Sequence, residues 1–156
     1  MIKKLTRLII LCVIFALALS FVGCKAKRLP VPPEQQKDVK PDIPEQIRRG
    51  ANQEPRLEVY LVDEKTIREM NLEEYLYGVV AGEMKNTWPE KALAAQAIIA
   101  RTFVLNFVSE KGGSKYSGAD ISTDIEEAQA WNMGEVNDKI RKAVDRTRGK
   151  VIVHNN

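Results

Sequence analysis

Two charged residues, Glu83 and Arg101, stand where the hydrophobic pattern calls for apolar ones. Glu83 continues by four residues an apolar helical stripe that reaches Val79. Arg101 lies in the segment 92–108, which is apolar on nearly all sides. A carboxyl group in such a place can act as a general acid or base, whereas a buried guanidinium needs an anionic partner or an opening to solvent. From the residues alone, two other interpretations stay open. Glu83 could lie on the surface at the end of a helix, and Arg101 could extend its charged end to solvent or form a structural salt bridge with Glu83.

Two helices and a short sheet are expected to position these charges. Alternating apolar residues predict a strand over 57–61, and a second short strand is predicted at 65–68, after a turn. The first helix follows Asn71, whose spacing from Glu74 is typical of a capping box. The second helix is so uniformly apolar that burial at a domain centre is expected. The sequence therefore predicts a small mixed α+β domain with a central apolar helix packed on short antiparallel strands.

A leader and a tether precede this domain, which is expected at residues 56–156. Residues 1–24 combine a basic start with an uncharged apolar run, shorter than the roughly 20 residues that a spanning helix needs. They end in Gly-Cys, as in bacterial lipoprotein signals, so Cys24 is predicted to be acylated; an uncleaved membrane anchor is the alternative. Residues 25–55 hold six of the seven prolines and no apolar periodicity, which predicts a disordered tether.

Charge and cysteine content exclude several classes of protein. The chain has 24 Lys and Arg against 21 Asp and Glu, and the excess lies within the first seven residues. This balance argues against a nucleic-acid partner, because such binding depends on clustered positive charge. Both cysteines, Cys12 and Cys24, belong to the leader, and the one histidine is His154. No internal disulfide, no metal site and no cofactor are therefore expected in the exported domain.

The segments around the two charges resemble a known family. Residues 72–84 (LEEYLYGVVAGEM) and 88–105 (WPEKALAAQAIIARTFVL) closely resemble the core of the stage II sporulation protein D family, the SpoIID/LytB domain of bacterial cell-wall proteins. A looser similarity runs through 119–131 and 143–152. The resemblance implies a lytic transglycosylase that cleaves peptidoglycan glycan strands, especially strands without stem peptides, in sporulation-related remodelling of the wall.

The resemblance also implies roles for individual residues. Glu83 matches the catalytic glutamate, which would protonate the glycosidic oxygen between N-acetylmuramic acid and N-acetylglucosamine and then accept the proton of the muramic C6 hydroxyl. The 1,6-anhydro product needs one carboxyl group, unlike the usual glycosidase pair. Because the acid acts in its protonated form, an apolar environment is expected around it. Arg101 is expected to bind a polar or anionic group of the substrate or to orient a neighbour. Gln129 and Trp131 are both candidates to help shape the groove, and for Trp131 a role in the core is favoured.

Two departures from the family pattern change these expectations. Zinc-containing members carry two cysteines where this chain has Ser122 and Ala128, so a zinc-free variant is expected. Family domains also continue past the segment that ends at Asn156, so the chain is expected to be either a natural truncation or a fragment of a longer gene product. A domain with unpaired sheet edges is expected in both cases. Glycan cleavage is the leading function. A non-catalytic peptidoglycan-binding or amidase-enhancing module is the alternative, and a fragment that does not fold alone is a third.

Partners and location follow from the same features. Glycan strands, the membrane and other cell-wall hydrolases are the expected partners. Both interpretations of the leader place the domain outside the cell, anchored to the outer face of the bacterial cytoplasmic membrane.

Overall fold

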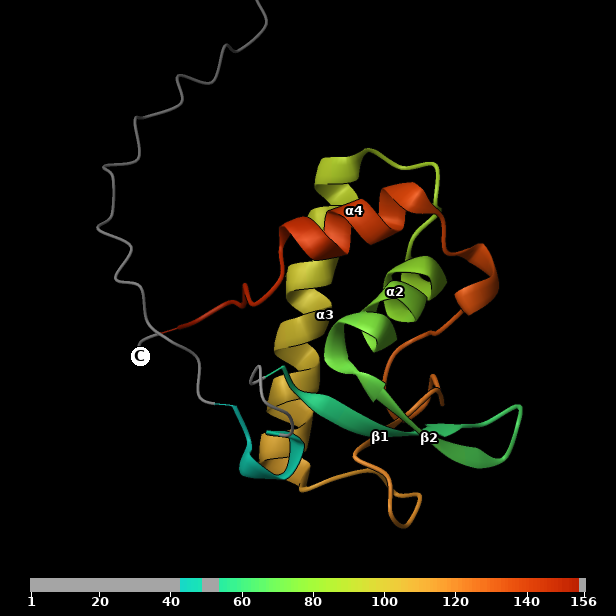
Figure 1. Ribbon diagram of the computed structural model, residues 1–156, viewed down its shortest axis with the longest axis vertical. Coiled ribbons are helices and arrows are strands. Elements are labelled where there is room, and N and C mark those ends of the chain that lie inside the picture. The colour runs from blue at the N-terminus through green and yellow to red at the C-terminus, as the bar shows by residue number, and fades with distance from the viewer. Residues whose placement is uncertain (1–42, 49–53, 155–156) are drawn as a thin grey trace, which may run out of the picture. The chain divides into compact units, whose positions relative to one another are not determined.

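The computed structural model describes residues 43–48 and 54–154 (Figure 1). The predicted signal or anchor with Cys24, and most of the predicted tether, lie outside the described residues. The described residues form a small mixed α+β domain, which confirms the predicted fold class. In chain order the elements are η1 (Glu45–Ile47), β1 (Arg56–Leu61), β2 (Thr66–Asn71), α2 (Leu72–Glu83), α3 (Glu90–Lys111), β3 (Ile121–Ser122), η2 (Met133–Glu135) and α4 (Asp138–Arg146).

The sheet has three strands in the order β2-β1-β3. β1 and β2 form the predicted antiparallel hairpin, with Leu57 opposite Met70. β2 runs further than predicted, to Asn71, and α2 follows directly. β3 pairs with β1 in parallel, through Val59 and Ile121, so the prediction of antiparallel strands is wrong for β3. The reason is the connection: α2 and α3 carry the chain back, so that it enters β3 in the direction of β1.

The helix α2 begins without the predicted capping box. Asn71 occupies the N-cap position in an extended conformation, but its side chain makes no capping hydrogen bond. Instead the Leu72 N–H donates to the carbonyl oxygen of Pro55 at 2.9 Å. The start of this helix is therefore fixed by the backbone that precedes β1.

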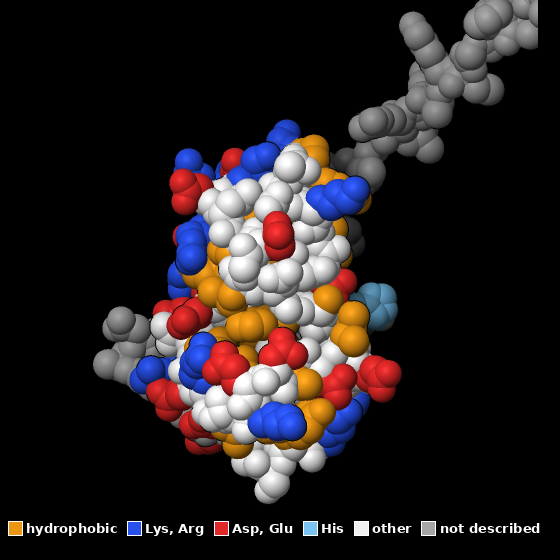
Figure 2. Space-filling model, turned by 90° about the vertical axis from the view of Figure 1, so that its right-hand side faces the viewer, with side chains coloured by type: hydrophobic (Ala, Val, Ile, Leu, Met, Phe, Trp, Pro, Cys, Tyr) orange, Lys and Arg blue, Asp and Glu red, His pale blue; other side chains and the backbone are white. Residues whose placement is uncertain are grey.

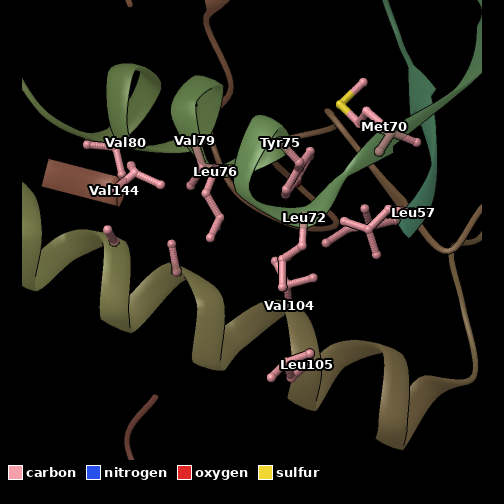
Figure 3. Close-up of a cluster of buried hydrophobic side chains, with 14 of the residues drawn as sticks. Leu57, Met70, Leu72, Tyr75, Leu76, Val79, Val80, Val104, Leu105 and Val144 are labelled. Atoms are coloured by element: carbon pink, nitrogen blue, oxygen red, sulfur yellow. The ribbon is translucent and has the colours of Figure 1, made fainter. Parts of the chain in front are cut away.

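The hydrophobic core lies between α2, α3, α4 and the inner face of the sheet. Figure 3 shows Leu76 and Val79 of α2 pointing toward α3, while Val144 of α4 lies beside Val80. Ile47 of η1, in a segment predicted as tether, is also fully buried in this core. Burial of these apolar side chains is the main force that holds α2 in place.

The long helix α3 is central, as predicted, but it is buried on one side only. Ile99 on its outer side is 49% exposed. Among the helices of the described residues, α3 alone has the length and apolar composition that crossing a membrane would require. It nevertheless packs against α2 and α4, as the core helix of a folded domain does. It ends at Lys111, and the next residue, Gly112, has a φ of 73°, the left-handed conformation that favours glycine at a helix C-terminus. Its buried residues are Leu93, Ala97, Ala100, Arg101, Val104, Leu105, Phe107 and Val108.

Charges of both signs are mixed on the surface. On the face shown in Figure 2, acidic and basic side chains lie close together, with hydrophobic side chains between them. This face therefore carries no broad region of one sign, as expected from the nearly equal numbers of acidic and basic residues in the chain.

Candidate functional site

Glu83 is the last residue of α2, and its side chain is exposed. Its Oε1 accepts the backbone N–H of Ala130 at 2.8 Å, while Oε2 has no donor among the described residues. Glu83 lines a pocket of about 450 Å³ at the connection between α2 and α3. The arrangement fixes one carboxylate oxygen and leaves the other available at the pocket. The remaining lining residues are Ala81, Gly82, Met84, Lys85, Asn86, Thr87 and Glu135.

The surroundings of Glu83 differ from the apolar environment that was expected. Val79 and Val80 are fully buried, but the helix leaves the core one turn later, so that Gly82 and Glu83 are exposed. Met84 then takes an extended conformation and ends the helix. The carboxylate is thus a surface group at the end of α2, held by a backbone donor.

Two glycines on one face of α2 bring that donor close. A Cβ atom on Gly82 would lie 2.6 Å from the backbone of Ala130, and one on Gly78 would lie 2.2 Å from Nε1 of Trp131. Residues four apart share a helix face, so both glycines admit the same segment. The Asn132 N–H also donates to the Gly78 carbonyl at 2.9 Å. This glycine face is what allows the Ala130 N–H to reach the carboxylate at the end of α2.

We expect Gly82→Ala to destabilise the protein by about 1–3 kcal/mol, the usual effect of overpacking. Alanine is the better helix former by about 1 kcal/mol, but its Cβ would meet the Ala130 backbone, which has to move and weaken the hydrogen bond to Glu83. Urea unfolding measures the change. The exposed Glu74→Ala on the same helix is the control, with an expected change below about 0.5 kcal/mol. A Gly82→Ala protein as stable as the wild type would contradict this packing.

Gln129 and Trp131 belong to the segment that packs on this glycine face. Gln129 is buried, and it is not among the residues that line the pocket of Glu83. Trp131 is half-buried and packs against the hydrophobic core, in agreement with the role expected for it. Gln129 Oε1 and Trp131 Nε1 are buried without a hydrogen-bond partner among the described residues. Gln129 thus lies buried next to Ala130, the residue that holds Glu83, rather than among the pocket residues. Its contact with substrate stays a prediction.

Arg101 is buried in a bidentate ion pair with Glu73. Its Nε donates to Oε1 at 2.9 Å and its Nη2 to Oε2 at 2.6 Å. Its Nη1 donates to the carbonyl oxygen of Lys150 at 2.9 Å. The side chains of Arg101 and Glu73 are 1% and 6% exposed. Such a guanidinium is satisfied by charge-assisted hydrogen bonds within the protein.

The structure does not bring Arg101 and Glu83 together. Glu73 lies in the first turn of α2 and Glu83 at its last residue, ten residues or about 15 Å along the helix axis. The partner that sequence-based prediction missed is therefore Glu73. Its spacing from Leu76 and Val80 is typical of a buried helix face and was the available signal. The neighbour that Arg101 holds in the structure is the Lys150 carbonyl, and its contact with substrate stays a prediction.

A hydrogen-bond network links Ser122 of β3 to Glu127 and to the loop around Ser114. Ser122 Oγ donates to Glu127 Oε2, as does Ser114 Oγ at 2.7 Å, and the Lys115 N–H donates to Oε1 at 2.5 Å. Burial raises the pKa of Glu127, but these hydrogen bonds outweigh it and the pKa is lowered. The charged carboxylate thus ties the loop around Ser114 to β3. Residues 43–48 and 54–154 contain no group of three His, Cys, Asp or Glu placed to hold a metal.

We expect the purified protein to bind no stoichiometric zinc, because Ser122 and Ala128 supply neither of the two thiolates. A chelator should therefore leave the thermal midpoint of unfolding unchanged. Elemental analysis and thermal unfolding with and without chelator measure this, with a known zinc protein carried through the same steps as the control. One tightly bound zinc per chain would contradict the expectation.

Glu135 of η2 is a second carboxylate at the pocket that sequence-based prediction missed. Asn86 Nδ2 donates to Glu135 Oε2 at 2.8 Å and to the Glu135 carbonyl oxygen at 3.2 Å. Asn86 is in turn held by Asn137, whose Nδ2 donates to the Asn86 carbonyl at 3.3 Å. Asn86 and Glu135 are 49 residues apart in sequence, and no periodic pattern surrounds Glu135. The sequence therefore contains no signal for their contact.

Comparison with known proteins identifies the family. The family model described as stage II sporulation protein (SpoIID) matches residues 60–154. The stage II sporulation protein D of Bacillus subtilis is 31% identical in an alignment 110 residues long that covers 63% of this chain and 32% of that protein. Its counterpart in Bacillus amyloliquefaciens is 30% identical in an alignment 129 residues long that covers 70% of this chain and 38% of the relative. An uncharacterized protein of Brachyspira hyodysenteriae is 35% identical over 89 residues, 56% of this chain and 23% of the relative.

The chain thus spans less than two fifths of the length of each of these three relatives. Glu83, Arg101 and Gln129 all fall within the matched residues. Since the family model covers more than half of the chain, the protein belongs to the SpoIID (stage II sporulation protein) family.

Proposed function

We propose that this protein is a lytic transglycosylase that cleaves peptidoglycan glycan strands in sporulation-related remodelling of the cell wall. The observation that carries the proposal is the carboxylate of Glu83, fixed on one oxygen by a backbone N–H at the edge of a pocket of about 450 Å³. Such a volume lies in the range of small-molecule binding sites. The names of the two Bacillus relatives support a role in sporulation.

The proposed reaction uses Glu83 twice. In its acid form it gives a proton to the glycosidic oxygen as the bond from muramic C1 breaks. The carboxylate then accepts the proton of the C6 hydroxyl, whose oxygen bonds to C1 and closes the 1,6-anhydro ring. The acid form is restored and no water is consumed. The Ala130 N–H keeps the carboxyl group in one orientation through both proton transfers.

The exposure of Glu83 sets a condition on this mechanism. The first step needs the protonated acid, whereas Glu83 is exposed to water in the free protein. The bound glycan must therefore exclude water from the pocket and favour the protonated form. On this proposal, long glycan strands that cover the pocket are better substrates than single disaccharides.

Product analysis tests the proposal. The protein is incubated with peptide-free glycan strands, and new chain ends are identified by mass spectrometry, with heat-denatured protein as the control. Anhydro-muramic ends are the expected result. Reducing ends, heavier by one water, would indicate hydrolysis instead. Glycan that is bound but not cleaved would favour the alternative, a peptidoglycan-binding or amidase-enhancing module.

The proposed place of action is the outer face of the cytoplasmic membrane. Anchoring through acylated Cys24, or through an uncleaved leader, would keep the domain near newly accessible glycan strands. Stem-peptide removal by other cell-wall hydrolases would supply its substrate. These proposals rest on the sequence, since Cys24 lies outside the described residues.

A further inference from the structure

We infer that Glu135, held by Asn86, is a substrate-positioning residue of the Glu83 pocket that accepts hydrogen bonds from sugar hydroxyl and acetamido N–H groups. The inference rests on the proposed glycan-directed function and assigns a second carboxylate to the same site. Both Glu83 and Glu135 line the pocket, one from the end of α2 and the other from η2.

The geometry holds one oxygen of Glu135 and leaves the other available. Asn86 Nδ2 bonds to Oε2 and also to the Glu135 carbonyl, so the side chain and backbone of Glu135 share one donor. Among the described residues, Oε1 has no hydrogen-bond donor. The same pattern holds at Glu83, where Oε1 accepts the Ala130 N–H and Oε2 is left without a donor. The pocket therefore presents two carboxylates, each fixed at one oxygen.

The chemistry of N-acetylated sugars matches such acceptors. Hydroxyl and acetamido groups are neutral donors, and hydrogen bonds to an ionised acceptor are about twice as strong as those between neutral groups. The two-step proton transfer needs a single carboxyl group, which Glu83 supplies, so Glu135 is available for binding. A fixed acceptor in the same pocket as the acid would hold the sugar unit in one orientation, which is a large part of what an active site contributes.

Glu135 is exposed, so its hydrogen bond to Asn86 contributes little to stability. Substitutions at position 135 should therefore leave the fold intact, and the thermal midpoint checks this. A loss of binding in a folded variant then reports on recognition of the sugar.

The test measures glycan binding in the Glu83→Gln background, where turnover does not deplete the ligand. A peptide-free tetrasaccharide of alternating N-acetylglucosamine and N-acetylmuramic acid is titrated by calorimetry. Adding Glu135→Ala should raise Kd about tenfold or more, since a hydrogen bond to a charged group contributes at least one decade of affinity. Glu135→Gln, which keeps a neutral acceptor, should give an intermediate Kd. Glu110→Ala, an exposed glutamate at the far end of α3, is the matched control and should leave Kd unchanged.

A double-mutant cycle tests the role of Asn86. If Asn86 acts through Glu135, then Asn86→Ala should weaken binding in the parent but add little once Glu135 is alanine. Unchanged Kd in Glu135→Ala would overturn the inference alone. A parent variant that binds no glycan would overturn it together with the glycan-directed function. Absence of anhydro product from the wild type, with Glu135-dependent binding retained, would instead reject the transglycosylase chemistry and leave the inference standing.

Discussion

Glu83→Gln should abolish the formation of anhydro-muramic ends while glycan binding persists. The amide keeps the size of the side chain, and its oxygen can still accept the Ala130 N–H. It has no acid proton to give to the leaving oxygen and cannot accept one from the C6 hydroxyl. Loss of general acid–base help costs about 10²–10⁴-fold in rate. Mass spectrometry of peptide-free glycan after timed incubation measures the rate of product formation.

The matched control is Glu74→Gln, an exposed glutamate on the same helix and away from the pocket. It should leave both the rate and the thermal midpoint unchanged. Equal product yields from Glu83→Gln and the wild type would remove Glu83 from the catalytic role, and the pocket would then need another acid.

The strands and helices with a regular spacing of apolar residues could be predicted from the sequence. The alternation over 57–61 and the helical stripe that begins at Leu72 both appear where expected. β3 could not be predicted, because two residues carry no periodicity and the strand exists only through its pairing with β1. The burial of Ile47 could not be predicted either, because the few apolar residues of this Pro-rich segment form no periodic pattern that would indicate contact with the core.

The parts of the site that depend on local sequence could be predicted. Glu83 could be identified because it follows the apolar helical stripe of residues 72–79 and because the segment 72–84 resembles the family's core motif. Gly78 and Gly82, four apart inside a helix, are the local sign of a close approach by another segment. The Asn86–Glu135 contact and the docking of Ala130 depend on chain segments about fifty residues apart, and only the three-dimensional arrangement shows them.

Arg101→Ala should destabilise the protein by about 3–5 kcal/mol, the largest stability effect expected at any residue considered. Removing the guanidinium leaves the Glu73 carboxylate buried without its partner, and an uncompensated buried charge carries that cost. The Lys150 carbonyl also loses its donor. Urea unfolding measures the change. Arg68→Ala, which breaks the exposed pair with Glu64, is the control and should cost less than about 1 kcal/mol.

A paired substitution separates this structural role from the predicted contact with substrate. Glu73→Leu combined with Arg101→Met removes both charges and fills the space with apolar groups, which often restores or exceeds the original stability. If Arg101 acts through the fold, this double variant should be stable, bind glycan normally and retain anhydro-product formation. If it is stable but binds glycan weakly, Arg101 contacts the substrate itself, and the ion pair seen here must open when glycan binds. Because Glu73 and Glu83 lie at opposite ends of α2, we expect the first result.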